Sequence, residues 1–224
     1  MLGLGAAVSI AALRAAPQAS ANVSDLIELT YTFLASLHAP TLDEFLTGWP
    51  RARSRREQQP APLPVVRWLN QLTTLAPGAC TALVAELARV APLLAWHQTY
   101  KRPEVSAAFL ENYGYTELVG LAGPVPSVRL ACGFLLLGPS TRYPRHHHEA
   151  QEIYVPLAGT AAWQHGNQPW RDEPPGTVIV HASDEPHAMQ TGSQPLLALY
   201  LWRSSNLNQK SRLDSSAATQ EKAQ

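Results

Sequence analysis

Apolar residues in the first hundred positions recur at spacings of three and four. One stripe runs through residues 26–37 and another through residues 83–94. This spacing places apolar side chains on one face of an α-helix. Pro40, Pro77 and Gly78 lie between the stripes, where they favour the ends of helices. The pattern therefore predicts amphipathic helices in this part of the chain.

The pattern changes after about residue 115, where short apolar runs alternate with glycine and proline. The main runs are Val128–Leu137, Glu152–Leu157, Thr160–Gln164, Thr177–Val180 and Leu196–Trp202. Several short strands at nearly regular spacing are typical of a small β-barrel or sandwich. The fold class that we predict is mainly β, with a helical N-terminal region in front of one barrel.

Four regions follow from these changes along the chain. We expect a flexible N-terminal segment over residues 1–21, helices over 22–103, the barrel over 104–203 and a disordered polar tail over 204–224. The first segment is rich in alanine and ends in an Ala-x-Ala-like sequence. Since it has no positive charge ahead of its apolar part, we interpret it as a frayed start and not as a signal peptide.

Charge and composition exclude several kinds of partner. Lys and Arg total 17, and Asp and Glu total 17, so the chain has neither the basic surface of a nucleic-acid-binding protein nor a polybasic membrane patch. No apolar run reaches the roughly 18 residues of a membrane-spanning helix. The two cysteines, Cys80 and Cys132, are too few for a disulfide framework. We expect a cytoplasmic protein without membrane or nucleic-acid partners, and the apolar helices are compatible with a homodimer.

Most of the eight histidines lie in the strand-rich half. Side chains alternate between the two faces of a strand, so residues with even numbers share a face. Such a set is formed by His146, His148, Glu152 and Tyr154, whereas His147 points away. Two imidazoles and a carboxylate form a ligand set that suits Zn, Fe, Mn or Ni, without any thiolate.

These residues also resemble a known motif. The pattern His146-x-His148-x3-Glu152-x6-Gly159 is similar to the first motif of the cupins, in which two histidines and a glutamate bind a metal inside a small barrel. The second cupin motif opens with a glycine and has a histidine eleven positions later.

Gly176 and His187 have the spacing of that second motif, while Ala182 and Asp184 replace its usual proline and glycine. The resemblance therefore implies a single cupin barrel, a double-stranded β-helix.

The resemblance is more specific over residues 143–191. The run 143–159, followed by 174–176 and 186–191, is similar to the cupin-type dimethylsulfoniopropionate lyases, which also have helices in front of the barrel. The distinguishing features are the tyrosine two residues after the glutamate, Tyr154, and the aromatic residue ahead of the histidines, Tyr143.

The resemblance implies a metal-dependent carbon–sulfur lyase that cleaves dimethylsulfoniopropionate, a small zwitterionic carboxylate, into acrylate and dimethyl sulfide by β-elimination. It also implies one divalent transition metal, with zinc as the first candidate and Fe, Mn, Co and Ni as alternatives. The implied ligands are His146, His148, Glu152 and His187. A cation on the substrate carboxylate lowers the cost of the second negative charge that proton removal creates.

In the resembled family the tyrosine at this position is the base, so the resemblance implies that role for Tyr154. A free tyrosine has a pKa of about 10, and a nearby cation favours the phenolate, so Tyr154 is a candidate base, a candidate ligand, or both in turn. The sulfonium group of the substrate prefers aromatic faces. The candidates for contacting it are Tyr143, Trp163 and Trp202.

Two alternatives stay open. One is a metal-dependent cupin isomerase, dioxygenase or lyase that acts on another small carboxylate. The other is a non-catalytic cupin that binds a small ligand. Three further histidines are interpreted as non-ligands: His147 because it points away, and His165 and His181 because they lie near expected turns and strand ends.

Overall fold

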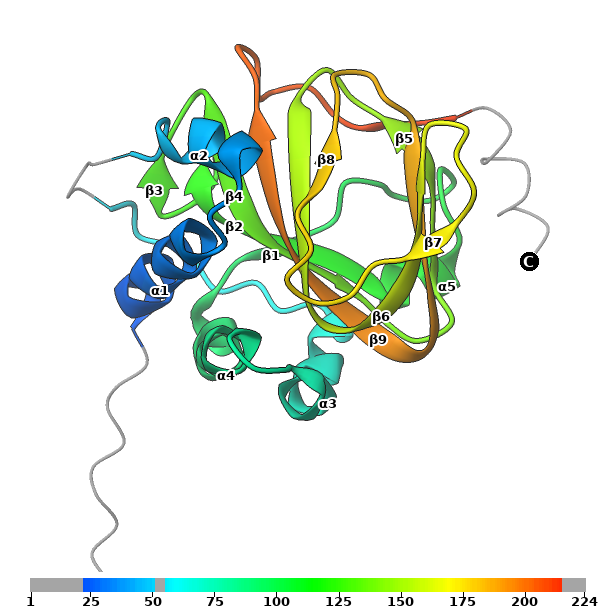
Figure 1. Ribbon diagram of the computed structural model, residues 1–224. Helices are drawn as coiled ribbons and strands as arrows, with labels where there is room; N and C mark the ends of the chain where they lie inside the picture. The colour runs from blue at the N-terminus through cyan, green and yellow to red at the C-terminus, as the bar shows by residue number, and fades with distance from the viewer. Residues whose placement is uncertain (1–21, 51–54, 215–224) are drawn as a thin grey trace, which may run out of the picture.

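A computed structural model describes residues 22–50 and 55–214 of the protein. The expectations for residues 1–21 and for residues 215–224 of the tail lie outside these described ranges. Figure 1 shows the helices of residues 23–90 packed on one side of a strongly curled sheet, as the sequence predicts. No helix in the described ranges is long and apolar enough to cross a membrane.

All the helices except the last precede the first strand along the chain. Their bounds are α1 Val23–Ser36, α2 Pro40–Leu46, α3 Leu69–Leu75, α4 Cys80–Val90 and α5 Ala107–Glu111, with the 3₁₀ turns η1 Pro64–Trp68 and η2 Ala91–Leu93. The two apolar stripes fall on α1 and on α4 with η2, so the prediction of amphipathic helices is confirmed there. The side chain of Asn22 accepts a hydrogen bond from the Ser24 amide and thereby caps α1.

The strands form one antiparallel-dominated sheet. Their bounds are β1 Trp96–His97, β2 Tyr113–Gly120, β3 Val125–Pro126, β4 Leu130–Leu137, β5 Arg142–His147, β6 Gln151–His165, β7 Arg171–Asp172, β8 Ile179–His181, β9 His187–Arg203 and β10 Arg212–Leu213. The hydrogen-bonded order is β1-β2-β4-β9-β5-β10, and β6 pairs with β7, β8 and β9. The curled sheet is the predicted barrel.

Strands β6 and β9 are longer than the apolar runs that predict them. The runs 152–157 and 160–164 join into one strand of 15 residues, with register shifts at Pro156/Ala158 and Gly159/Ala161. Gly159 adopts a φ of 78°, and a Cβ atom there would lie 1.7 Å from the Pro195 carbonyl oxygen. Only glycine permits this close approach, so the bulge bends β6 without ending it.

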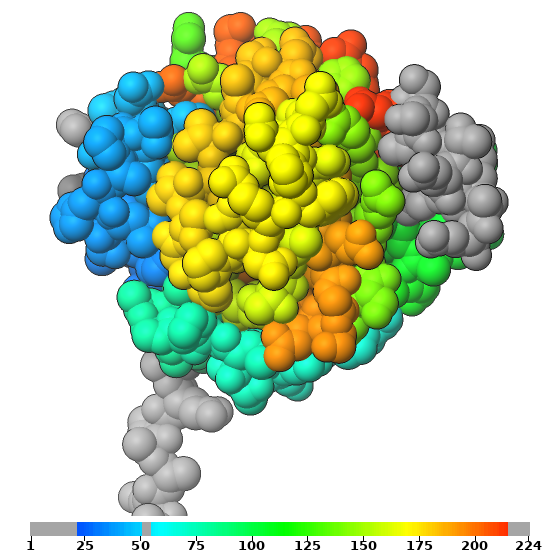
Figure 2. Space-filling model, turned by 45° about the vertical axis from the view of Figure 1, so that its right-hand side comes forward, coloured from blue at the N-terminus to red at the C-terminus, as the bar shows by residue number. Residues whose placement is uncertain are grey.

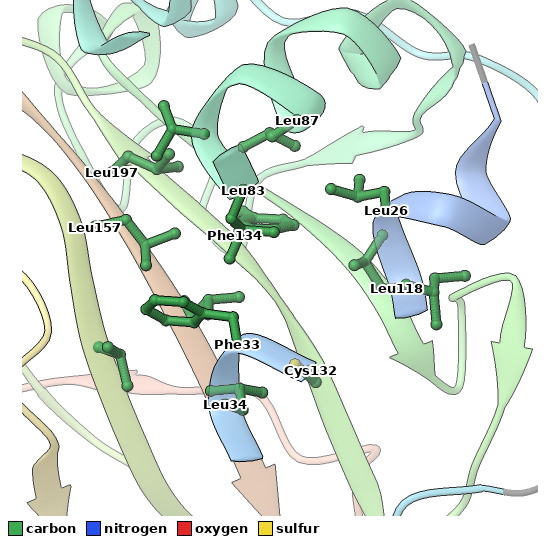
Figure 3. Packing of buried hydrophobic residues seen from close by; sticks show 14 of the residues in the cluster. Leu26, Phe33, Leu34, Leu83, Leu87, Leu118, Cys132, Phe134, Leu157 and Leu197 are labelled. Atoms are coloured by element: carbon green, nitrogen blue, oxygen red, sulfur yellow. The ribbon is translucent and has the colours of Figure 1, made fainter. Parts of the chain in front are cut away.

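The central strands are buried on both faces. Their outer face packs against α1 and α4, where Figure 3 shows Phe33, Leu83 and Leu87 meeting Phe134 and Leu197. Their inner face forms a second cluster rich in tyrosine. The helices thus cover one wall of the barrel, and the inner face is left to form the site.

Two turns of the second cupin-like motif use positive φ angles. Gly176 has a φ of 90°, and Asp184, which replaces the usual glycine, has a φ of 58°. Aspartate tolerates this left-handed region better than most residues. The Asp184 amide donates to the carbonyl of His148 over 2.8 Å, so the loop keeps its place beside the histidines despite the replacement.

The described chain beyond the barrel differs from the expected disordered tail. Strand β10 pairs with β5, and the carboxylate of Asp214 accepts hydrogen bonds from Arg145 and His147, each over 2.9 Å. These contacts hold residues 204–214 against the barrel. Figure 2 shows another covering segment, the chain between β6 and β9 in yellow and gold, on the face of the barrel beside the helices.

Candidate metal centre

Three buried histidines converge inside the barrel. His146 lies near the end of β5, His148 follows that strand, and His187 begins β9 opposite His146. One ring nitrogen from each lies within 4.8 Å of those of the others. All three side chains are almost fully buried. The pairing of β5 with β9 therefore creates a compact group of imidazoles.

The second nitrogen of each ring is held by the backbone. In every case Nδ1 lies 2.8 or 2.9 Å from a carbonyl oxygen two residues away in the chain. The acceptors are the carbonyls of Pro144, Ala150 and Glu185. When Nδ1 carries the proton and donates it, the Nε2 lone pair faces the centre, which is the arrangement found in histidine ligands of metals.

Glu152 completes the group from β6. Its Oε2 lies 3.0 Å from Nε2 of His148 and 3.1 Å from Nε2 of His187, while its Oε1 accepts a hydrogen bond from Trp202 over 2.6 Å. Although burial opposes ionisation, His148 and His187 hold the pKa of Glu152 well below its usual range. The site therefore contains a buried carboxylate beside imidazole nitrogens.

This donor set fits a metal ion. Nε2 of His187 is buried without a hydrogen-bond partner in the described ranges, although the Glu152 carboxylate is near. A buried polar atom without a partner is unfavourable, and a cation would satisfy it. Three imidazole nitrogens and one carboxylate oxygen are a usual ligand set for zinc and other divalent transition metals.

Two of the other histidines have distinct surroundings. His147 points away from the centre and pairs with Asp214, in the orientation that strand alternation predicts. His181 is also buried, and its ring stacks on that of His187 with centroids 4.0 Å apart. Burial and His187 lower the pKa of His181 to about 2, so its ring is neutral. The sequence did not indicate this stacking contact.

Tyr154 lies on β6 next to Glu152 on the same face. Its ring centroid is 6.3 Å from that of His187 and 5.2 Å from that of Trp163. Burial and the charge of Glu152 raise the pKa of Tyr154 well above 10. The phenol is therefore protonated unless a nearby positive charge favours the phenolate.

A cavity of about 310 Å³ adjoins the centre. Its lining includes Glu152, Tyr154, Tyr143 and Trp202, so two of the three aromatic candidates face it. Trp163 is not among the lining residues and packs beside Tyr154 instead. The expected substrate contact of Trp163 therefore has no support in this arrangement.

Several lining residues were not anticipated from the sequence. They are Tyr113, Tyr115, Glu117 and Tyr200 from the inner face, together with Leu207–Ser211 from the segment after β9. The alternation of Tyr113, Tyr115 and Glu117 in β2 was an available signal, because alternate residues share a face. The position of segment 207–211 carries no comparable signal.

The geometry can be compared with known proteins. A family model described as dimethylsulfoniopropionate lyase matches residues 44–198. The chain belongs to the dimethylsulfoniopropionate lyase family. This confirms the family that residues 143–191 resemble.

Two curated relatives of this lyase family are similar to the chain. The putative dimethylsulfoniopropionate lyase DddL of Cereibacter sphaeroides is 35% identical over 158 residues, which are 68% of this chain and 66% of the relative. The dimethylsulfoniopropionate lyase DddQ of Ruegeria pomeroyi is 31% identical over 170 residues, which are 75% of this chain and 84% of the relative. The chain thus spans just under two thirds of DddL.

Solved structures of dimethylsulfoniopropionate lyases have the same fold. The crystal structure of DddQ from Ruegeria pomeroyi DSS-3 has a TM-score of 0.78 and 28% identity, covering 85% of this chain and 95% of that one. A chain from the crystal structures of RdDddP and RnDddQII has a TM-score of 0.75 and 30% identity, covering 86% and 97%. These similarities confirm the predicted cupin architecture with N-terminal helices.

The hydrogen bond from Trp202 to Glu152 leads to a first prediction. Trp202→Phe keeps an aromatic ring against His148 but removes the donor to Oε1, and we expect metal affinity to fall about 10- to 100-fold. Competition with a chromophoric chelator measures this affinity. Trp170→Phe is the matched control, because Trp170 contacts Arg142 and not the centre. Unchanged affinity in Trp202→Phe contradicts an orienting role for the indole.

Proposed function

We propose that the protein is a metal-dependent carbon–sulfur lyase that splits dimethylsulfoniopropionate into acrylate and dimethyl sulfide. The observation that carries this proposal is a buried group of three histidines and a glutamate at the wall of an aromatic cavity, with Tyr154 beside it on the same strand face. Membership of the lyase family gives the substrate. The proposed substrate is therefore a small zwitterionic carboxylate.

The ligands of the metal in this proposal are His146, His148, Glu152 and His187. Among divalent transition metals we propose zinc, because three nitrogens and one carboxylate oxygen suit its four-coordinate preference. When bound, the metal supplies the positive charge that stabilises the substrate carboxylate as a second negative charge develops next to it. The chain contributes buried donors whose second nitrogens are already fixed by backbone carbonyls.

Tyr154 is the proposed base. Its phenolate oxygen takes the proton from the carbon next to the substrate carboxylate. The electron pair of that carbon–hydrogen bond forms the double bond of acrylate, while the adjacent carbon–sulfur bond breaks and its electron pair leaves with sulfur. Because dimethyl sulfide leaves as a neutral molecule, no acid is required at that end.

The aromatic residues of the cavity wall bind the sulfonium group in this proposal. Tyr143 and Trp202 line the cavity together with Tyr115 and Tyr200, and aromatic rings attract cations through their π faces. Each such contact contributes roughly 0.5 to 2 kcal/mol when water is excluded. The walls therefore favour a sulfonium group over bulk solvent.

Headspace measurement of dimethyl sulfide tests the proposal. Purified protein of known metal content, given dimethylsulfoniopropionate, is expected to release dimethyl sulfide and acrylate in equal amounts. Treatment with a chelator is expected to abolish release, and zinc is expected to restore it. Absence of release from fully metallated protein contradicts the proposal and favours another small carboxylate as substrate.

A further inference from the structure

A second carboxylate reaches the cavity from the opposite part of the sheet. Glu117 on β2 pairs with Gly133 on β4, which pairs with Tyr200 on β9, which in turn pairs with Tyr154 on β6. Glu117, Tyr200 and Tyr154 all line the cavity. Glu117 and the Glu152 of the metal centre thus face one cavity from strands that are separated by two others.

In this row of paired residues, the residue between Glu117 and Tyr200 has no side chain. Residue 133 is a glycine, and a Cβ atom there would lie 1.8 Å from the backbone oxygen of Thr116. Strands β2 and β4 therefore approach one another in a way that only glycine permits. As a result, nothing from β4 stands between Glu117 and Tyr200 in this row.

Glu117 forms no ion pair within the described ranges. Its Oε1 accepts hydrogen bonds from the amides of Ala122 and Gly123, over 2.6 and 2.8 Å. Within the described ranges, no lysine, arginine or histidine forms an ion pair with it, and the nearby Arg56 donates to the carbonyls of Gly120 and Leu121 instead. Burial raises the pKa of Glu117, while the two amides and Arg56 oppose that effect.

The tyrosine opposite has an unsatisfied group. The hydroxyl of Tyr200 is buried and has no hydrogen-bond partner in the part of the chain that the structure describes. Besides burial, the charge of Glu117 raises the pKa of Tyr200, which places the two groups within electrostatic reach. The lone pairs of this hydroxyl oxygen are therefore not used by a donor in the described ranges, and their partial negative charge can face a cation in the cavity.

A sulfonium ion suits this arrangement. It has no hydrogen to donate, so a protein can bind it only through charge and through π faces. Tyr115 and Tyr200 supply two rings in an edge-to-face pair with centroids 6.0 Å apart, and both line the cavity with Glu117. A carboxylate that lines the same cavity adds an attraction that is stronger there than in water.

We propose that Glu117 binds the cationic end of the substrate and makes the cavity selective for zwitterionic carboxylates over simple ones. The inference rests on the proposed function for the identity of the cation. It gives the cavity two charged ends: the metal centre at Glu152 receives the carboxylate, and Glu117 receives the sulfonium. Glu117 acts in binding and takes no part in proton transfer.

Two ligands that have the same shape and differ only in the positive charge test this role of Glu117. In 3-(trimethylammonio)propionate the cation is a quaternary nitrogen, and in 4,4-dimethylpentanoate that nitrogen is replaced by carbon. Isothermal titration of the zinc-loaded protein gives the ratio of the two dissociation constants. Wild type is expected to prefer the cationic ligand by at least about tenfold.

Glu117→Gln keeps an oxygen acceptor for the amides of Ala122 and Gly123 and removes only the charge. It is expected to reduce the preference about tenfold by weakening the cationic ligand alone. Glu111→Gln is the matched control, because Glu111 is exposed and outside the cavity. A role limited to supporting the 121–123 loop would instead weaken both ligands or neither.

The outcomes separate this inference from the proposed function. A wild type without preference for the cationic ligand, or an unchanged ratio in Glu117→Gln, overturns the role of Glu117 even if dimethyl sulfide is released. A charge preference that depends on Glu117, in a protein that releases no dimethyl sulfide, supports the binding role and contradicts the lyase reaction. If Glu117→Gln fails to fold, the ratio of the two dissociation constants for wild type still tests the inference, because a ratio near one overturns it.

Discussion

Tyr154→Phe is expected to lower kcat about 10²- to 10⁴-fold, the usual contribution of a general base. The substitution removes the hydroxyl and keeps the ring that packs against Trp163. Metal content and the affinity for acrylate are expected to stay close to wild type, since the ligand group and the other cavity walls are unchanged. Steady-state release of dimethyl sulfide, measured together with metal content, tests this expectation.

A matched control for this variant is Tyr100→Phe. Tyr100 is buried, and its hydroxyl donates to Ser211 without lining the cavity. Its loss is expected to change kcat less than tenfold. Near-normal turnover by metal-loaded Tyr154→Phe shows that another group removes the proton.

His148→Ala is expected to have the other large effect, the loss of stoichiometric metal and of activity down to background. The substitution removes one proposed ligand and the hydrogen-bond partner of the buried Glu152 carboxylate. A buried charge that loses its partner typically costs about 3–5 kcal/mol. Elemental analysis after dialysis measures the metal, and urea unfolding of the metal-free proteins measures the stability.

The neighbouring histidine is the control for this experiment. His147→Ala removes an imidazole one position away, but that ring faces Asp214 at the surface of the barrel. Its metal content is expected to equal that of wild type. If His148→Ala retains one metal ion per chain and normal turnover, the assignment of the ligand group is wrong.

Motif spacing predicted the centre because three of its residues are close in sequence. His146, His148 and Glu152 lie within seven positions, but they stand in β5, after β5 and in β6, which does not pair with β5, so alternation along one strand or hairpin does not explain their convergence. His187 came only from the spacing of the second cupin-like motif. The structure brings these four residues together as the resemblance implied, although their role as ligands stays a prediction.

The rest of the cavity depends on pairings between distant strands. Glu117 meets Tyr200 only through the register of β2, β4 and β9, and no local pattern indicates which residues a barrel brings face to face. Trp163 was a candidate wall residue; after the two bulges in β6 it lies in the inner cluster beside Tyr154, but it does not line the cavity. Periodicity cannot follow a strand through bulges of this kind.

Residues 204–214, the described part of the expected tail, depart from the expectation for a different reason. Their serine, asparagine and glutamine residues have the composition of a mobile tail. Their contacts with the barrel include the pairing of β10 with β5 and the ion pair of Asp214 with Arg145. Composition describes the average residue and does not detect single anchoring contacts.

Strand β9 contributes residues to both the metal centre and the cavity wall. It begins at His187, carries Tyr200 and Trp202 near its end, and pairs with β4, β5 and β6 along its 17 residues. A slip of one position would turn these inward side chains to the outer face. The number of residues between His187 and Tyr200 is therefore constrained. Insertions and deletions are far easier to accommodate in the loops that flank β9 than within this part of the strand.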